Sequence, residues 1–322
     1  MVTKIQFVFF IKLILLISAF SELSAQSEEK KYVILIHGGV GTIDRQMPDS
    51  IKNHYLISLS KALSIGQIIL EQGGTSLDAV EQVVRFMEDD PRFNAGKGSV
   101  YTADGTHELD ASIMDGRDLS CGAIAGVKTI KNPVSLARLV MEKTPHVLLI
   151  SEGAEAFGKS MSVDIVPNDF FNTQHRYEQW QKSISKEIKG TVGCVALDIY
   201  GNLSAATSTG GTTNKMPGRV GDIPIVGAGI YANNETCAVT CSGKGELFIK
   251  HSVAYNISAL MKYKSFSLKD AAEEMINKTI SKGNGGLIAV DKDGNYILVY
   301  NTDGMFRGAA TSSGIFEIKI WE

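Results

Sequence analysis

The residues on either side of one threonine constrain this chain more than any other feature. Thr191 follows a polar, lysine-rich stretch, 182–189, and precedes an apolar run, 192–198, that predicts a buried strand. Thr191 can simply be a threonine at the edge of a strand, with no catalytic role. If the bond between Gly190 and Thr191 is cut, however, Thr191 gains a free α-amine beside its hydroxyl. One residue then carries both the nucleophile and the general base.

The chemistry of that cut depends on the two residues that it separates. The Thr191 hydroxyl would attack the carbonyl of Gly190 and form an ester, which water then opens. Glycine tolerates the twisted backbone that this attack needs and does not crowd it. The freed α-amine has an unperturbed pKa of about 7.7–8.0, so it can accept the hydroxyl proton near neutral pH without a histidine. No other serine or cysteine stands in a nucleophile motif such as G-x-S-x-G with its partners.

Length and composition are those of an ordinary globular protein. The 322 residues are 44% hydrophobic and 21% charged, with a formal net charge of −3. That length allows a large core, in one large domain or two smaller ones. The near-neutral charge balance argues against nucleic acid or an anionic membrane surface as the main partner.

The first 25 residues have the pattern of a secretory signal peptide. Lys4 and Lys12 punctuate an apolar run, 7–20, and residues 23–25 offer the small side chains that a signal peptidase reads. An uncleaved membrane anchor is the alternative, but the run is short for a span and Lys12 interrupts it. We expect cleavage after Ala25, export to a bacterial periplasm or outside the cell, and no membrane attachment afterwards.

Four cysteines lie in apolar, strand-like segments, at Cys121, Cys194, Cys237 and Cys241. An oxidising compartment permits disulfides, but nothing in the spacing fixes a pairing, which stays open. Cys237 and Cys241 are not followed by a second Cys/His pair at zinc-binding spacing. We therefore expect neither a cysteine metal site nor a cysteine nucleophile.

Periodicity along the rest of the chain predicts a mixture of helices and strands. Helical spacing covers 51–71, 75–87, 133–141, 246–261 and 268–281, with Thr75 as a cap for the second helix. Strand-like runs cover 32–37, 109–114, 121–127, 192–198, 203–207, 225–231, 235–240, 286–290, 296–301, 306–309 and 315–320. Two glycines, at 38 and 39, predict a sharp turn, and 157–190 has the composition of a surface helix and mobile linker. Helices between sets of antiparallel-looking strands indicate a layered α+β architecture.

Several motifs follow one another along the chain. They are the His37-Gly38-Gly39 sequence, the Gly190-Thr191 pair, and the runs 201–211, 214–222 and 227–234. Together they resemble the plant-type L-asparaginases, also called isoaspartyl peptidases or β-aspartyl peptidases, which are Ntn-hydrolases that cut themselves to expose a threonine. The resemblance covers nearly all of the chain after about residue 31. It implies a four-layer αββα sandwich.

The resemblance also implies a division of the mature chain at the scissile bond. Residues 26–190 would form the α subunit and residues 191–322 the β subunit of one domain, paired as (αβ)₂. Thr209 matches a second threonine that hydrogen-bonds the nucleophile, and Asn94 matches an asparagine placed beside it. Taken alone, both are explained as turn residues.

Two residues of a glycine-rich loop match the substrate receptors of this family. Arg219 would clamp the α-carboxylate of the substrate through its planar guanidinium, and Asp222 would take the α-ammonium. A bare Arg-x-x-Asp pair is otherwise most often a surface ion pair. Together the two residues would recognise a free amino-acid head group, as in asparagine or a β-linked aspartyl residue.

The segment 242–246 follows an apolar strand and opens a helix. Backbone N–H groups at such a junction stabilise a developing oxyanion. The resemblance gives this role to Ser242 and Gly243, and places Gly243 and Gly245 against the substrate. The family usually has Thr-Gly at the first two positions, so Ser242 is a departure that keeps the hydroxyl, and a plain helix N-cap is its alternative. Lys244 stands at a variable position and could bias substrate choice.

The segment 87–97 resembles a loop that holds a structural Na⁺ or a similar cation through backbone carbonyls. The carbonyls implied are those of Met87, Glu88, Asp90, Phe93, Ala95 and Lys97. The resemblance implies no cofactor for catalysis. We expect His37 to be structural, since the mechanism needs no histidine, and the glycines after it to let the backbone approach the active centre.

These features predict an autoprocessing threonine amidohydrolase with small-molecule substrates. It would cleave β-aspartyl (isoaspartyl) dipeptides and hydrolyse L-asparagine to L-aspartate and ammonia, through a β-aspartyl ester on Thr191. Glycosylasparaginase, which acts on glycoasparagines, is the nearest alternative, and the motifs at His37 and Asn94 favour the asparaginase branch. A protein-cutting threonine aspartase and a binding module that never cleaves are further alternatives.

Overall fold

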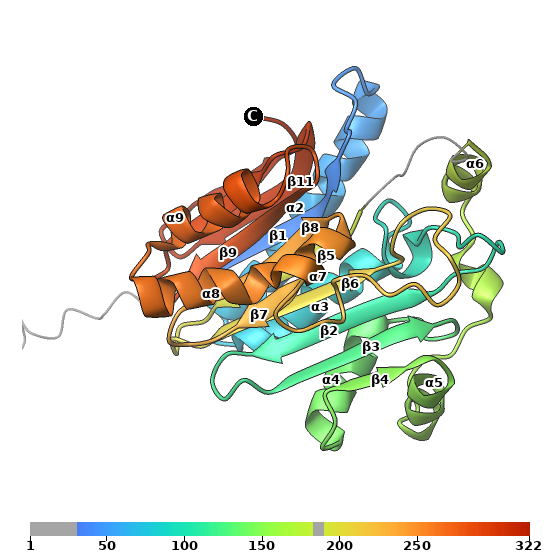
Figure 1. Ribbon diagram of the computed structural model, residues 1–322, viewed down its shortest axis with the longest axis horizontal. Helices are drawn as coiled ribbons and strands as arrows, with labels where there is room; N and C mark the ends of the chain where they lie inside the picture. Colours follow the sequence, from blue (N-terminus) through green and yellow to red (C-terminus); the bar gives the residue numbers. More distant parts are fainter. Residues whose placement is uncertain (1–30, 183–189) are drawn as a thin grey trace, which may run out of the picture. The chain divides into compact units, whose positions relative to one another are not determined.

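The computed structural model describes residues 31–182 and 190–322 (Figure 1). The larger of its two sheets has eight strands. Its order is β12-β11-β1-β5-β6-β2-β3-β4, and neighbours are antiparallel except β3 and β4. The strands are β1 (Val33–Gly41), β2 (Leu109–Asp115), β3 (Cys121–Val127), β4 (Leu148–Ile150), β5 (Val192–Leu197), β6 (Leu203–Thr209), β11 (Gly304–Thr311) and β12 (Phe316–Lys319). The expected signal peptide lies outside the described residues.

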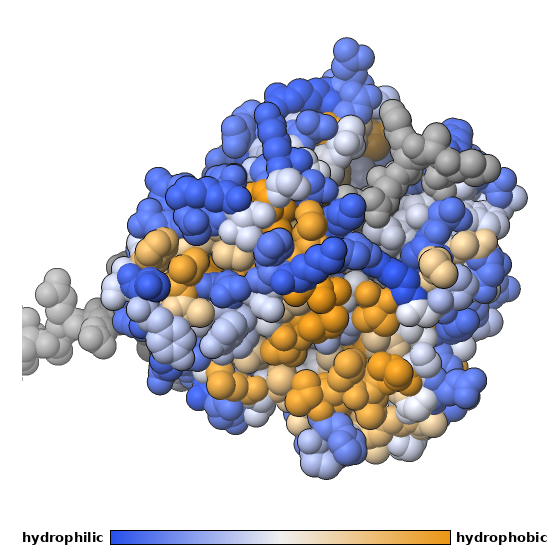
Figure 2. All heavy atoms as spheres, viewed as in Figure 1, coloured by the Kyte–Doolittle hydropathy of each residue, from blue (hydrophilic) through white to orange (hydrophobic). Residues whose placement is uncertain are grey.

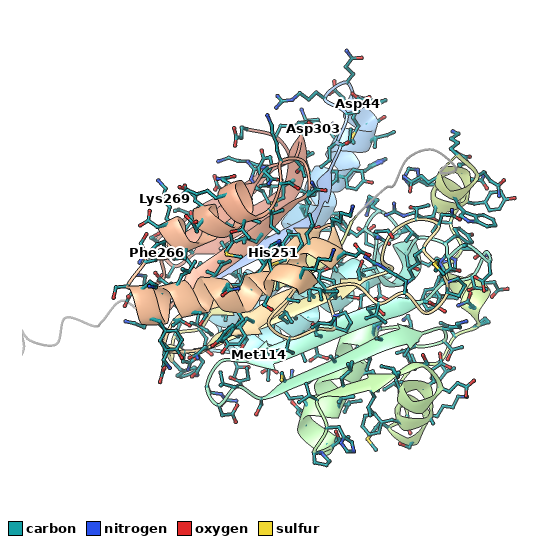
Figure 3. The ribbon with its side chains drawn as sticks, viewed as in Figure 1. Asp44, Met114, His251, Phe266, Lys269 and Asp303 are labelled. Carbon is teal, nitrogen blue, oxygen red and sulfur yellow. The ribbon has the colours of Figure 1, made fainter. Side chains whose placement is uncertain are left out.

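A smaller sheet of four antiparallel strands, in the order β10-β9-β8-β7, packs on one face of the first. Its strands are β7 (Ile230–Ala232), β8 (Cys237–Gly243), β9 (Gly285–Asp291) and β10 (Tyr296–Tyr300). Aliphatic side chains from both sheets form the buried layer between them, including Leu35 of β1, Met114 of β2 (labelled in Figure 3) and Ile288 of β9. Facing sheets bury their inward-pointing side chains in this way.

Helices cover the outer face of each sheet. The helices α2 (Asp49–Glu71), α3 (Ser76–Asp89) and α4 (Pro133–Lys143) share one buried cluster with the eight-stranded sheet. The helices α7 (Gly245–His251), α8 (Val253–Lys264) and α9 (Leu268–Glu273) share another with the four-stranded sheet. This order of helix, sheet, sheet and helix confirms the αββα sandwich.

The two predicted subunits are interleaved in the larger sheet. Strand β1, from before the predicted cut, lies between β11 and β5, which both follow it. Strand β6, from after the cut, pairs with β2, from before it. Cleavage between Gly190 and Thr191 would therefore leave the two pieces hydrogen-bonded to each other.

Local signals placed several element ends correctly. Thr75 caps α3 by accepting a hydrogen bond from the N–H of Asp78. Pro133 occupies the first turn of α4, where its missing N–H costs little. The segment after β4 contains α5 (Ser151–Ser160), a 3₁₀ turn (Asn168–Phe171) and α6 (Gln174–Lys182), and the rest of the expected linker, 183–189, lies outside the described residues.

The predicted turn after the first strand is wrong. Strand β1 continues to Gly41, and its register against β11 shifts between His37 and Gly39. The glycines therefore serve an irregularity inside the strand rather than a turn that ends it.

Three further predictions were correct only in part. The predicted helix 246–261 is broken at Ser252, whose φ of 44° is left-handed, directly after His251 at the end of α7 (Figure 3). The predicted helix 268–281 becomes α9 followed by a π-helical turn, Glu274–Thr279. The predicted strand 225–231 is mostly loop, because β7 begins only at Ile230 and Val226 forms no more than an isolated bridge with Ile230.

Candidate active site

The bond predicted to be cut lies immediately before β5, between β1 and β6 in the sheet. Thr191 is buried, and its Oγ1 lies 2.8 Å from the carbonyl oxygen of Gly190 and 3.3 Å from Oγ1 of Thr209. Thr209 is the last residue of β6. Because Val192 of β5 stands opposite Ser208 of β6, the register of the sheet brings the two threonines together.

The carbonyl oxygen of Gly190 accepts hydrogen bonds from two further side chains. The Thr209 hydroxyl donates to it over 3.0 Å and Asn94 Nδ2 over 2.8 Å. Asn94 is itself held in place, because Nδ2 also donates to the carbonyl of Gly211 over 2.7 Å and Oδ1 accepts from the N–H of Val100 over 2.9 Å. Donors aimed at a carbonyl oxygen stabilise the negative charge that it gains when its carbon is attacked. The family resemblance implied that Asn94 and Thr209 lie beside Thr191, and in the structure both donate to the carbonyl of Gly190, the residue before it.

Strand β1 approaches the scissile bond so closely that a side chain would not fit at Gly39. Gly39 has a φ of +107°, and a Cβ there would lie 3.0 Å from Cα of Gly190 and 3.1 Å from the backbone N of Thr191. His37 is fully buried, with Nδ1 3.1 Å from the carbonyl oxygen of Thr191. Burial lowers the pKa of His37 to about 4. The ring is therefore neutral near pH 7, and a hydrogen bond to the carbonyl requires the proton on Nδ1, which is a structural role.

The side chains of Arg219 and Asp222 both lie beside Gly245. A Cβ at Gly245 would lie 2.7 Å from Oδ1 of Asp222 and 3.1 Å from Nη2 of Arg219. Burial raises the pKa of Asp222 to about 7, and the nearby charge of Arg219 opposes that rise. Oδ2 of Asp222 has no hydrogen-bond partner among the described residues. A guanidinium and a buried carboxyl in this arrangement suit a ligand with a carboxylate and an ammonium group.

The ion-pair partner of Arg219 is Glu246, which no sequence pattern predicted. Nε and Nη2 of Arg219 donate to Oε1 of Glu246 over 3.1 and 3.0 Å. The alternative of a surface ion pair between Arg219 and Asp222 is therefore wrong. Glu246 lies 27 residues further along the chain and belongs to no motif with Arg219, so only the fold reveals the contact.

Ser242 and Gly243 are the last residues of β8, and α7 begins at Gly245 with Lys244 as its N-cap residue. The alternative of Ser242 as a helix N-cap is therefore wrong. Its Oγ accepts a hydrogen bond from the N–H of Val40 over 3.2 Å, which ties β8 to β1. The oxyanion and substrate roles of this segment stay predictions.

The loop after α3 offers carbonyl oxygens to a cation. If the helix continued, the N–H of residue 91 would donate to the carbonyl of Met87, but Pro91 has no N–H. The N–H of Arg92 would donate to the carbonyl of Glu88, but it donates to the side chain of Asp90 instead. The carbonyl of Glu88 faces Gly96, where a Cβ would lie 2.3 Å from it. Carbonyls without helical donors at the negative end of a helix fit a monovalent cation.

The other carbonyls of the predicted cation loop are partly engaged. Those of Asp90 and Ala95 accept hydrogen bonds from backbone N–H groups of the same loop, although each oxygen has a second lone pair. Phe93 lies in a bend and Lys97 in the 3₁₀ turn Gly96–Gly98, and the Lys97 side chain donates to a backbone carbonyl outside the loop. Within the described ranges, no three His, Cys, Asp or Glu side chains are grouped to hold a metal ion. The loop thus fits a structural ion held by backbone, beside Asn94.

The four cysteines are free thiols in the structure, and three of them are buried. Burial raises the pKa of Cys121, Cys194 and Cys241, and raises that of Cys237 to about 12. A thiol that does not ionise near pH 7 is a poor nucleophile and a poor metal ligand. The threonine remains the candidate nucleophile.

The sequence is similar to a known family and to several of its members. The family model described as asparaginase matches residues 30–189 and 183–320. The isoaspartyl peptidase of Salmonella typhimurium is 50% identical over 309 residues, which cover 89% of this chain and 99% of the relative. The isoaspartyl peptidase of Escherichia coli is 48% identical, covering 90% and 97%. The probable isoaspartyl peptidase/L-asparaginase 2 of Arabidopsis thaliana is 40% identical, covering 90% and 99%.

Proposed function

Because the chain belongs to the asparaginase family, we propose that it is a self-cleaving threonine hydrolase with isoaspartyl peptidase and L-asparaginase activity. One observation carries this proposal. The Thr191 hydroxyl lies 2.8 Å from the carbonyl oxygen of Gly190, and that oxygen accepts hydrogen bonds from Asn94 and Thr209. A nucleophile and two donors are thus assembled on one peptide bond. The expected substrates follow from the names of the relatives.

Self-cleavage begins with the chain intact. Oγ1 of Thr191 attacks the carbonyl carbon of Gly190, and the oxygen that becomes negative is stabilised by Asn94 Nδ2 and the Thr209 hydroxyl. The bond between that carbon and the Thr191 nitrogen then breaks, and the nitrogen takes the hydroxyl proton. Water hydrolyses the resulting ester to a Gly190 carboxylate and a free Thr191 with its own α-amine.

The mature site would use the same hydroxyl on a small substrate. Arg219 binds the α-carboxylate and Asp222 the α-ammonium of an aspartyl head group, so that the β-carbonyl is presented to Thr191. The Thr191 amine accepts the hydroxyl proton and passes it to the leaving ammonia or peptide amine. Water then releases aspartate from the β-aspartyl ester. These steps use side chains of the protein, the Thr191 α-amine and water, and need no catalytic cofactor.

Hydrolysis of matched substrates tests this proposal. We expect wild-type protein to release aspartate from a β-aspartyl dipeptide and from L-asparagine, but not from the α-linked isomer of that dipeptide. The Thr191→Ala variant serves as the control and should release none. Preferred hydrolysis of a glycoasparagine would favour glycosylasparaginase instead. A chain that stays whole and inert would favour a binding module.

We also propose that the mature protein pairs as (αβ)₂ through the edge of the larger sheet. Strand β4 is an edge strand with exposed apolar residues, since Leu148 is 42% and Ile150 58% exposed, and Val147, directly before the strand, is 48% exposed. Figure 2 shows hydrophobic residues gathered on the face that contains β2, β3 and β4. Contiguous exposed apolar surface of this kind is typical of a protein–protein contact.

We propose export as the location, on the pattern of residues 1–25. The described helices include none with the length and hydropathy to span a membrane.

A structural cation held by the carbonyls of the loop from Met87 to Lys97 would brace the segment that carries Asn94, without taking part in the reaction.

A further inference from the structure

The guanidinium of Arg219 is held on one edge by a carboxylate that no substrate-binding role explains. We propose that Glu246 is a positioning residue, which reserves the Nε–Nη2 edge of Arg219 and leaves its Nη1 side for the substrate α-carboxylate. This inference rests on the proposed function, because it concerns recognition of the same aspartyl head group.

The contact has the geometry of a fixed support. Two nitrogens of Arg219 donate to the same oxygen of Glu246, over 3.1 and 3.0 Å. The Arg219 side chain is 17% exposed and that of Glu246 is 46% exposed, so the guanidinium is the inner partner. Glu246 lies in the first turn of α7, a helix that is packed on the four-stranded sheet. The support therefore comes from the scaffold rather than from the loop that carries Arg219.

Glycines make room around the guanidinium. A Cβ at Gly221 would lie 2.9 Å from Nη1 and 3.4 Å from Nη2, and a Cβ at Gly245 would lie 3.1 Å from Nη2. Neither glycine has a positive φ, so the space beside Arg219, rather than backbone conformation, requires them.

The Nη1 side faces the residues that contact the scissile bond. A Cβ at Gly211 would lie 3.3 Å from Nη1 of Arg219, and the carbonyl of Gly211 accepts a hydrogen bond from Asn94. Asn94 in turn contacts the carbonyl of Gly190. A carboxylate bound on this side of Arg219 would therefore lie toward Thr191, whereas one bound at Nε would not.

Without Glu246, the two receptors of the head group would neutralise each other. Asp222 is buried, its Oδ2 has no hydrogen-bond partner in the described structure, and Arg219 already acts on it through space. A guanidinium released from Glu246 would turn toward that carboxyl, since buried charges are stabilised by pairing. The substrate ammonium and carboxylate would then both lose their partner. Glu246 keeps Arg219 and Asp222 apart.

Steady-state kinetics with a β-aspartyl dipeptide test this inference. We expect Glu246→Ala to raise KM about tenfold or more with little change in kcat, which is the pattern of lost ground-state binding. Glu246→Gln keeps an oxygen that accepts from Arg219 and should show a smaller rise. The rate of self-cleavage, which needs no head group, should equal that of wild type in both variants. Glu235→Ala, which removes an exposed ion pair with Lys262, is the matched control and should leave KM unchanged.

The possible failures are distinguishable. An unchanged KM in Glu246→Ala, with active wild type, would overturn the inference alone. A lower KM would overturn it too, because Glu246 would then compete with the substrate for Arg219. A wild-type protein that cuts itself but hydrolyses no β-aspartyl substrate would overturn the proposed function, and the inference with it.

Discussion

The residues around one carbonyl oxygen, that of Gly190, determine whether the chain can cut itself. Asn94 and Thr209 come from opposite sides of the predicted cut, yet both donate to Gly190. Neither makes this contact because of its own local sequence, since the loop after α3 and the end of β6 meet only in the folded sheet. The donors are in place before any amine is freed, which is what self-cleavage requires.

Replacing Asn94 by Ala should slow self-cleavage by about 10²–10³-fold, the usual effect of removing one oxyanion donor. The fraction of cut chain against time, followed on denaturing gels, measures this. The thermal midpoint must be recorded alongside, because Asn94 also contacts Gly211 and Val100. Cleavage of a folded variant at the wild-type rate would show that this hydrogen bond does not assist the attack.

His37 should make stability depend on pH. Its folded-state pKa is lowered to about 4 from 6.5, so the unfolded chain takes up a proton first as the pH falls. The neutral His37 ring therefore contributes to the free energy of unfolding above pH 6.5. This contribution is lost as the pH falls from about 6.5 to 4, to a limit of about 3 kcal/mol. His37→Asn can keep the donor to Thr191 without titrating. The difference in unfolding free energy between the two proteins should shrink by that amount over this range, and a constant difference would exclude His37 as the cause.

At the scale of elements, sequence patterns predicted what local chemistry determines. The cap at Thr75 and the proline that starts α4 act within one turn, so their signals stand beside the structure that they cause. The break at Ser252 and the irregularity in β1 depend on packing between distant segments, and a helical or strand-like periodicity continues through both. The contact between Arg219 and Glu246 has the same origin, because the loop and α7 meet only after the sheets have formed.

The junction of β8 and α7 gives a prediction at this scale. A Cβ at Gly245 would intrude between Asp222 and Arg219, so Gly245→Ala should raise KM for asparagine about tenfold or more. Alanine is the better helix former by up to about 1 kcal/mol, so the thermal midpoint should not fall through helix propensity. Self-cleavage should proceed normally. A variant with wild-type KM would place the substrate head group elsewhere.

At the scale of the whole molecule, the interleaved sheet explains how a chain can be cut in its middle and stay folded. Strand β1 is bonded on both sides by strands that follow Thr191. The exposed apolar strand β4 lies at the edge of the same sheet, where pairing with a second copy would cover it. The same sheet would thus hold the two pieces together after the proposed cut and offer an edge to the proposed second copy.

The pairing surface can be tested by one charge. Ile150→Glu places a carboxylate on an exposed position of β4, so we expect light scattering to give half the wild-type mass for an otherwise folded, self-cleaved protein. Tyr263→Glu, at a residue of α8 that is 68% exposed, is the control and should keep the wild-type mass. An assembly that survives Ile150→Glu would place the contact on another face.

The intact mass of purified protein over time shows whether Thr191 becomes an N-terminal residue. For wild type we predict two fragments that meet between Gly190 and Thr191 and separate only on denaturation. Thr191→Ala should give one uncut chain under the same conditions. A wild-type chain that stays whole, or a cut that persists in Thr191→Ala, would contradict the assignment of Thr191 as the nucleophile.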